Sequence, residues 1–342
     1  MLETLKTLCS LGGVSGSEDE VREYILARCL PCADSIDTDA LGSLCIFKRG
    51  AVTPAKEIML CAHMDEVGLI VTSIDECGVL RFDCVGGIDR RVLIGKRVLV
   101  GENKLPGVIG IKPVHLTEGD ETKQTPKVDE LYIDIGARSR ESAESLVELG
   151  DVCLFDTQPE EIGSLLKARA IDDRVGCAAM IKLIESELPC DCRFVFTVQE
   201  EVGCRGAAAA AARVKPYAAL VLEGTTTTDT PDLDESKVIC RAGEGICIPV
   251  MDGGTIYDRE LSAELRGCAD ALGIAHQTKR RITGGTDASA VQRSTQGVRV
   301  ACAAVPVRNI HSPASMAHFS EIEALPQLAL AFLRRCAEMF AE

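Results

Sequence analysis

The chain has 342 residues, of which 46% are hydrophobic and 26% are charged, a balance typical of a globular protein with a sizeable core. The 52 acidic residues outnumber the 37 basic ones, so the formal net charge is −15. Because phosphate backbones are bound by clustered Lys and Arg, this charge argues against nucleic acid as a partner. It weakly favours cationic ligands, metal ions included.

The 17 cysteines are odd in number and scattered in spacing. Cys29 and Cys32 form the only C-x-x-C pair, and because no second pair accompanies it we do not expect a closed structural zinc site. A redox pair is the weaker alternative, since these cysteines follow a predicted helix rather than open one. We interpret most of the thiols as reduced. No apolar run approaches the ~18–20 residues of a membrane span, so we predict a cytoplasmic protein without a signal peptide or membrane partner.

The first predicted element is an amphipathic helix over Ser17–Leu30, which a capping box of Ser17 and Glu20 would open. Strands are predicted next near residues 43–47 and 58–62. This order of elements is typical of an α/β domain.

From Leu69 to about Phe155, short β-like runs recur between Gly and Pro residues, and only Arg140–Leu149 reads as a helix. The predicted strands of this region are 69–74, 79–83, 97–100, 108–114 and 131–135. After Ile162 the alternation of strands and helices returns. The helices predicted there are 172–188, 206–214, 258–272 and 320–340, the last with a capping box of Ser320 and Glu323, and the strands are 194–198, 218–222 and 298–305.

This pattern predicts a mixed-sheet α/β domain, residues 1–68 and 163–342, interrupted by a small β-rich insertion, residues 69–162. The two segments of the α/β domain flank the insertion and would fold together.

Two segments place polar residues that could bind metal ions beside the predicted apolar strands and helices. His63 lies in the segment 61–68, which directly follows the apolar run 58–60. This is the carboxyl end of a strand, where ligands of α/β sheets bind, and Asp65 could hydrogen-bond the imidazole. Asp172 and Asp173 open an apolar helix, where either could bridge two cations or simply cap the helix. Taken alone, a solvated histidine and a helix cap are the commoner interpretations.

Three further segments follow strands. Glu200 and Glu201 end the strand 194–198, Glu223 ends the strand 218–222, and His311 lies beyond the strand 298–305. Each alone is more often a feature of a solvated surface.

Together the segments present two imidazoles and three carboxylates, from His63, Asp172, Glu201, Glu223 and His311. Such a set suits Zn, Mn or Co, and five ligands with one shared carboxylate fit two metal ions. Glu200 is left free as a general base, and the chain has neither a G-x-S-x-G nucleophile motif nor a phosphate-binding loop.

Six segments, in this order, resemble the tetrahedral aminopeptidases, a family of dinuclear metallopeptidases also known under endoglucanase and glutamyl aminopeptidase names. They read AHMDEVG, IDDRVG, QEEVGCRGA, LEGTTTTDTPD, GGTDASA and RNIHSP, and the resemblance covers roughly residues 2–340. It implies a zinc-peptidase-like catalytic domain whose insertion mediates dimerisation. It also implies a cytoplasmic homododecamer built from dimers, with peptides as substrates.

The resemblance also implies roles for single residues. His63 and Glu223 would hold one metal ion, Glu201 and His311 the other, and Asp172 would bridge both. Zinc is the expected ion, with cobalt or manganese as alternatives. Asp65 would orient His63, and Glu200 would be the base for the attack of a water activated by the two metal ions.

Many relatives have Asp where this chain has Glu223, and the choice between Asp172 and Asp173 as the bridge rests on the related peptidases. The segment Gly284–Asp287 resembles the family's substrate-facing loop, which implies that Gly285, Thr286 and Asp287 bind substrate; the alternative is a plain glycine-rich turn. His115 could reach an active site or lie on the surface.

Two alternatives to the aminopeptidase stay open. An endoglucanase-like glycoside hydrolase would need a suitably spaced carboxylate pair and would favour aromatic platforms, yet the chain has no Trp and only 4% aromatic residues. A catalytically inactive scaffold is the second alternative, although all five predicted ligands and Glu200 are present.

Overall fold

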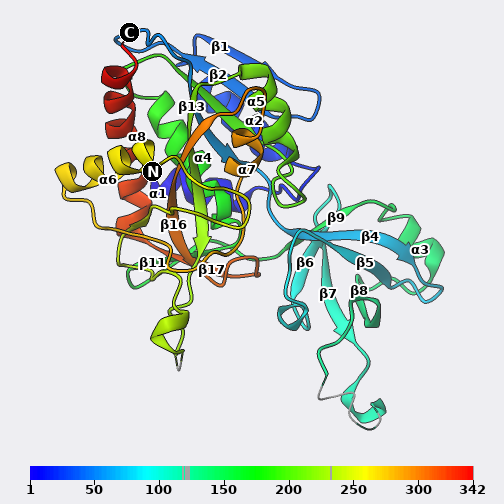
Figure 1. Ribbon diagram of the computed structural model, residues 1–342. Coiled ribbons are helices and arrows are strands. Elements are labelled where there is room, and N and C mark those ends of the chain that lie inside the picture. The colour runs from blue at the N-terminus through cyan, green and yellow to red at the C-terminus, as the bar shows by residue number, and fades with distance from the viewer. Residues whose placement is uncertain (118, 120–123, 232, 342) are drawn as a thin grey trace.

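The fold consists of an α/β part and a β-barrel (Figure 1), seen in a computed structural model that describes residues 1–117, 119, 124–231 and 233–341. The large sheet has 11 strands in parallel and antiparallel pairings, and the barrel is closed. The predicted mixed α/β fold with a small β-rich part is therefore confirmed. Asp232, the last residue of the LEGTTTTDTPD segment, lies outside the described residues.

The large sheet is formed by strands from both ends of the chain. Its strands are β1 (Ser35–Thr38), β2 (Leu44–Lys48), β3 (Ile58–His63), β10 (Glu160–Ile162), β11 (Leu165–Ala168), β12 (Cys192–Thr197), β13 (Ala218–Thr226), β14 (Ile246–Cys247), β15 (His276–Gln277), β16 (Arg299–Arg308) and β17 (Ser315–His318). The order is β1-β2-β12-β3-β13-β16-β17-β11-β10, while β14 pairs with β15 and β16. Every residue of β3 is buried, as expected for a central strand that is covered on both faces.

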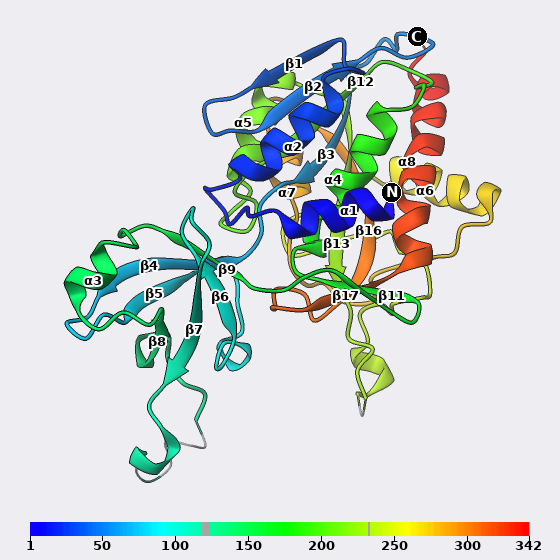
Figure 2. The same cartoon turned by 180° about the vertical axis from the view of Figure 1, so that it is seen from behind.

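Helices cover both faces of this sheet (Figures 1 and 2). They are α1 (Leu2–Ser10), α2 (Asp19–Cys29), α4 (Ile171–Ile184), α5 (Arg205–Val214), α6 (Arg259–Leu272), α7 (Ala288–Gln292) and α8 (Phe319–Met339). Leu60 and Ala62 of β3 belong to the core cluster that includes residues of α1, α2, α4, α6 and α8, whereas Met59 and Cys61 belong to the cluster that includes residues of α5 and α7. None of the helices in the described ranges combines the length and apolar character that a bilayer crossing requires.

The barrel lies to one side of the α/β part, to which it is joined at two points of the chain (Figure 2). Its elements are β4 (Gly68–Ile74), β5 (Leu80–Val85), β6 (Arg97–Val100), β7 (Leu105–Ile111), β8 (Leu131–Asp134), α3 (Arg140–Glu144) and β9 (Val152–Phe155). The strands close in the order β4-β5-β8-β7-β6-β9 around a core of their own, which includes Leu69, Leu80, Val98 and Ile133. Closure leaves the barrel without a free strand edge.

Parallel pairing brings the chemically important strand ends together. Thr197 of β12 pairs with His63 of β3, and Val221 of β13 pairs with Cys61 of β3. Since the strands run in the same direction, Glu223 follows on β13 at about the level of His63. The sequence predicted that Glu223 ends its strand. Strand β13 continues to Thr226, however, so Glu223 lies within it.

The two predicted capping boxes are wrong. Helix α2 has Glu18 at its N-cap, and Glu20 accepts a hydrogen bond from the backbone N–H of Gly12 instead of closing a box. At the start of α8, the ring of His318 accepts from the backbone N–H of Ser320. At α2 a contact with another segment replaced the predicted box, and at α8 the ring of the N-cap residue His318 did so.

A buried ion cluster joins the sheet edge to the helices. Glu66, which follows β3, forms an ion pair with Arg169 and lies 3.3 Å from Arg174 Nη2. Arg174 is fully buried and also donates to the carbonyl oxygens of Met64 and Leu8. The cluster therefore fixes α1 and the loop after β3 against the start of α4.

Replacing Arg174 by Met should lower the free energy of unfolding by about 3–5 kcal/mol, because it removes half of the charge facing the buried Glu66. Urea denaturation measures the loss. Arg28→Met is the matched control, since the Arg28–Glu185 pair is about one-third exposed and its loss should cost at most about 1 kcal/mol. Equal losses in the two variants would contradict this account.

Glu321 at the start of α8 predicts a pH dependence of stability. Burial raises its pKa from 4.5 to about 7, although the backbone N–H groups of Gly245 and Gly243 donate to Oε1 and lower it. The folded state thus holds this proton more tightly than the unfolded chain, so the contribution is complete below about pH 4.5 and is lost as the pH rises through about 7.

Glu321→Gln should remove this dependence. Between about pH 5 and pH 7.5, the free energy of unfolding of the parent protein should fall by up to about 3 kcal/mol relative to that of the variant. Chemical denaturation at a series of pH values measures the difference. Parallel profiles for the two proteins would show that the carboxyl group titrates normally.

Candidate metal centre

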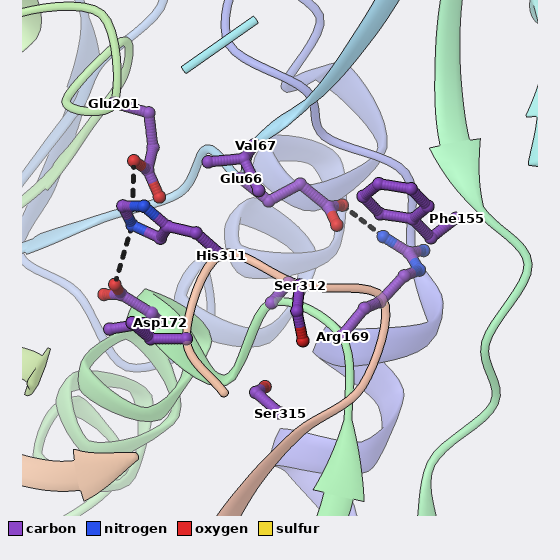
Figure 3. A pocket seen from close by; sticks show the side chains of 11 residues that line it. Glu66, Val67, Phe155, Arg169, Asp172, Glu201, His311, Ser312 and Ser315 are labelled. Carbon is purple, nitrogen blue, oxygen red and sulfur yellow. Dashed lines mark hydrogen bonds and ion pairs between the residues drawn. The ribbon is translucent and has the colours of Figure 1, made fainter. Parts of the chain in front are cut away.

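The structure brings all five predicted metal ligands together at the carboxyl ends of the parallel strands. Asp172 lies between the two imidazoles: its Oδ1 is 3.3 Å from His63 Nε2 and its Oδ2 is 3.5 Å from His311 Nε2. Glu223 Oε1 lies 3.3 Å from His63 Nε2, and Glu201 Oε2 lies 3.2 Å from His311 Nε2. Figure 3 shows His311 between the carboxylates of Glu201 and Asp172.

Asp65 supports this arrangement from behind. Its Oδ1 lies 3.4 Å from His63 Nδ1 and accepts a hydrogen bond from the backbone N–H of Glu200, while its Oδ2 accepts from the N–H of Glu201. Ser15 donates to Oδ2 at 2.6 Å. Burial raises the pKa of Asp65, but these contacts, led by the one to His63, lower it below its usual value. One buried carboxylate therefore positions both an imidazole and the Glu200–Glu201 loop, a double role that the sequence did not reveal.

Asp172 and Asp173 differ in their surroundings. Both carboxylate oxygens of Asp173 accept backbone N–H groups, from His63 and from Gly176. Asp172 Oδ1, in contrast, is buried and accepts no hydrogen bond from any described residue. Asp173 also lies within reach of His63 and Glu223. Because the carboxylate oxygens of Asp173 already have hydrogen-bond partners, Asp172 has the greater need for a cation.

Gly224 allows this close approach. A Cβ atom at this position would lie 3.0 Å from the Cα, Cβ and Oδ1 atoms of Asp172. The glycine after Glu223 therefore lets the start of α4 lie directly on β13, which places Asp172 beside the strand ends.

His311 is held by the barrel. Its Nδ1 lies 2.9 Å from the carbonyl oxygen of Gly87, in the loop between β5 and β6, which fixes the tautomer that leaves Nε2 toward the carboxylates. The His311 side chain is 34% exposed, against 2% for His63, so the centre opens on this side. A hollow of about 560 Å³ adjoins it, lined by 309–314 and by barrel residues that include Gly87, Asp89 and Lys96.

The electrostatics of the centre demand positive charge. Burial lowers the pKa of His63, but the facing carboxylates, led by Glu223, raise it well above its usual value. Burial likewise lowers the pKa of His311, and hydrogen bonds to Asp172 and Glu201 raise it to about 11. The carboxylates thus draw protons onto both rings, and divalent cations would satisfy the same demand with the rings neutral. The donor set, together with an Asp172 oxygen that faces the His63 ring without a hydrogen bond from any described residue, fits metal ions.

Glu200 lies beside the five groups and forms no ion pair among the described residues. Burial, reinforced by the charges of Asp287 and Glu201 although opposed by His63, raises its pKa to about 8. A carboxylate with a pKa near neutrality is suited to accept and return protons.

The predicted substrate loop divides into two halves. Gly284 and Gly285 are exposed, whereas Thr286 and Asp287 are 7% and 1% exposed. The Tyr257 hydroxyl lies 3.2 Å from Thr286 Oγ1 and donates to Asp252 at 2.5 Å. Sequence reasoning missed Asp252 and Tyr257, which lie in no recognisable motif.

His115 lies away from these groups. It is exposed in the short 3₁₀ helix Val114–Leu116, which follows β7. Among the described residues, no hydrogen bond or ion pair joins it to the five groups.

The chain matches the family model of the M42 glutamyl aminopeptidases over residues 42–328. It is a member of the M42 aminopeptidase family. The glutamyl aminopeptidase of Lactococcus lactis subsp. cremoris is 32% identical over 324 residues, which cover 91% of this chain and 90% of that protein. This M42 chain is accordingly a metal-dependent aminopeptidase, and the glycoside-hydrolase alternative is not supported.

Two solved structures are similar to this M42 peptidase over nearly all of their length. A TET aminopeptidase from Thaumarchaeota archaeon SCGC AB-539-E09 has a TM-score of 0.93 at 32% identity and covers 99% of this chain and 98% of its own. The Pyrococcus horikoshii TET1 peptidase, described as assembling into a tetrahedron or a large octahedral shell, has a TM-score of 0.85 at 35% identity, with 97% and 98% covered.

Replacing His311 by Ala should remove one metal equivalent per chain, because Glu201 and Asp172 would lose the imidazole between them. Metal analysis after exhaustive dialysis measures the stoichiometry. His276→Ala is the control, since among the charged groups of the described residues His276 pairs with Asp270 alone, outside the centre. Unchanged metal content in His311→Ala would remove this residue from the ligand set.

Proposed function

We propose that this aminopeptidase holds two divalent metal ions, zinc foremost and cobalt or manganese as alternatives. His63 and Glu223 would hold one ion, His311 and Glu201 the other, and Asp172 would bridge the two. The single observation that carries the proposal is the position of Asp172, whose two oxygens face different imidazoles at 3.3 and 3.5 Å. One carboxylate shared in this way suits a pair of ions about 3.5–4 Å apart.

Each side chain has a distinct task in the proposed hydrolysis of the peptide bond. When bound, the two ions supply Lewis acidity that makes a water nucleophilic and polarises the scissile carbonyl. Glu200 takes a proton from the attacking water and passes it to the leaving amine, for which a pKa raised toward neutrality by burial is suited. Asp65 keeps His63 in one tautomer and fixes the backbone of Glu200, so the base stays aimed at the centre.

We propose that carboxylates near Glu200 bind the free α-amino group of the substrate. We propose that the segment Gly285, Thr286 and Asp287 contacts the substrate, with the two glycines of 284–285 leaving room for its backbone. The substrate would enter from the side of His311, where the centre is open. Such an arrangement removes one residue at a time from the N-terminus of a peptide.

We also propose that residues 69–162 form a dimerisation domain and that residues 1–68 and 163–342 form the catalytic domain. Large apolar side chains are exposed on the barrel and its loops, among them Val108, Val114, Leu116 and Leu149. A contact between two barrels would remove side chains of this kind from water. The similarity to the Pyrococcus horikoshii TET1 peptidase, which can assemble into a tetrahedron, and to PhTET1-12s, solved as a dodecamer, supports a homododecamer built from dimers.

We propose a cytoplasmic location because the cysteines form no disulfide bonds. All 17 are free, and 11 of them are buried, where they pack as small apolar side chains. A chain rich in unpaired thiols is suited to a reducing compartment.

Hydrolysis of aminoacyl-p-nitroanilides and short peptides tests the proposed activity. The metal-free protein should be inactive, and zinc, cobalt or manganese should restore the release of single N-terminal residues. N-acetylated peptides should not be cleaved. A protein that has two ions bound and cleaves no member of the panel would leave the inactive-scaffold alternative as the better account.

Glu200→Gln should keep both metal ions and lose at least about 10²-fold in kcat, because the amide cannot accept the proton. Steady-state kinetics and metal analysis on the same sample measure both quantities. Glu185→Gln, at the opposite end of α4 from Asp172, should leave kcat and metal content unchanged. Retained turnover in Glu200→Gln would show that another group is the base.

A further inference from the structure

A second group of potential ligand atoms lies beside the metal centre. One carboxylate oxygen of Glu200, the Sγ of Cys204 and one carboxylate oxygen of Asp287 all lie within 4.8 Å of one another. The Cys204 thiol points at Glu200 Oε1, 3.4 Å away. The three side chains come from the loop after β12, the N-cap of α5 and the N-cap of α7, so the fold brings separate segments together here.

Asp287 has a buried oxygen without a partner. The residue is 1% exposed, and its Oδ2 accepts from the Thr197 hydroxyl at 2.5 Å and from the Cys61 thiol at 3.7 Å. Its Oδ1 is buried and accepts no hydrogen bond from any described residue. A buried acceptor without a partner costs free energy, which a bound cation would recover.

No basic side chain of the described residues forms an ion pair with Glu200 or Asp287. The remaining neighbours of the Cys204 thiol are neutral: Thr286 O lies at 3.5 Å and the Ser289 hydroxyl at 3.8 Å. Two carboxyl groups and a thiol therefore lie together, and within the described ranges no basic side chain pairs with the two carboxyl groups.

We propose that Glu200, Cys204 and Asp287 form a third metal site, which binds a thiophilic divalent ion such as Zn²⁺ or Cd²⁺ and inhibits the peptidase. The inhibition rests on the proposed role of Glu200 as base. Binding replaces the thiol S–H bond by a sulfur–metal bond and releases the proton to water. The ion also occupies the Glu200 carboxylate, which then cannot take a proton from the attacking water.

The thiolate gives this site a different selectivity from the two-metal centre. The proposed ligands of the centre are imidazoles and carboxylates, which zinc, cobalt and manganese all accept. Sulfur favours zinc and cadmium over manganese. Excess zinc or cadmium should therefore inhibit the loaded enzyme, whereas excess manganese should not.

Titration of the metal-free protein with Co²⁺ tests binding at the third site directly. The first two equivalents should bind without sulfur ligation, and further cobalt should produce the near-ultraviolet absorption of a cobalt–thiolate bond. Cys204→Ser and Asp287→Asn should each lose this band. Cys77→Ser, which changes an exposed thiol on the barrel, should keep it. A band of equal strength in Cys204→Ser, or no band in the parent protein, would overturn the proposal.

Inhibition by excess zinc gives the second readout, with each variant's rate compared with its own rate at two equivalents. Excess zinc should lower the hydrolysis rate of the parent protein and of Cys77→Ser by at least about tenfold, and that of Cys204→Ser by less than about twofold. The reason is that only the first two proteins keep the thiol that holds an ion on the Glu200 carboxylate. A cobalt–thiolate band without inhibition would overturn the inhibitory role and contradict Glu200 as base. Absence of both, in an active enzyme, would overturn the site and leave the proposed function intact.

Discussion

The burial of many carboxylates at one edge of the sheet is the constraint on which the rest of the structure depends. Asp65, Asp172, Asp173, Glu223 and Glu201 have side chains at most 12% exposed, and only two imidazoles face them. Carboxylates this close together and this far from water are costly unless cations or hydrogen bonds compensate them. Backbone N–H groups compensate Asp65 and Asp173, and two metal ions would compensate the others.

The α/β part and the barrel meet at this edge. Gly87 of the barrel orients His311, and Glu66, at the point where the chain leaves the sheet for the barrel, is fixed by Arg169 and Arg174. The barrel therefore contributes to the geometry of the centre besides any role in assembly. An interface formed through the barrel would act on the same loop that holds the exposed imidazole.

Much of the fold could be predicted from the sequence, since apolar strands and amphipathic helices have clear periods. The apolar stretches before His63 and Glu200 predicted the two strands at whose ends these polar side chains lie. The short α7 and the two-residue strands β14 and β15 could not be predicted, because they depend on tertiary pairing. The capping box predicted at Glu20 was wrong, because its carboxylate accepts a hydrogen bond from the backbone N–H of Gly12.

The set of five groups at the centre could be anticipated because each lies near the end of a predicted strand or at the start of a predicted helix, although Glu223 proved to lie within β13. The sequence could not choose between Asp172 and Asp173, since their difference lies in which backbone N–H groups face them. Gly87, Ser15 and Asp252 were equally hidden, because they act through contacts far apart in the chain. The Cys204 thiol lies within a recognised motif, yet only the fold places it beside Asp287.

Anomalous diffraction from crystals of the zinc-loaded protein tests the central claim most directly. We expect two peaks, one contacting His63 and Glu223, the other contacting His311 and Glu201, with Asp172 contacting both. A single peak at full zinc occupancy, or two peaks of which Asp172 contacts only one, would contradict the shared carboxylate and with it the proposed two-metal centre.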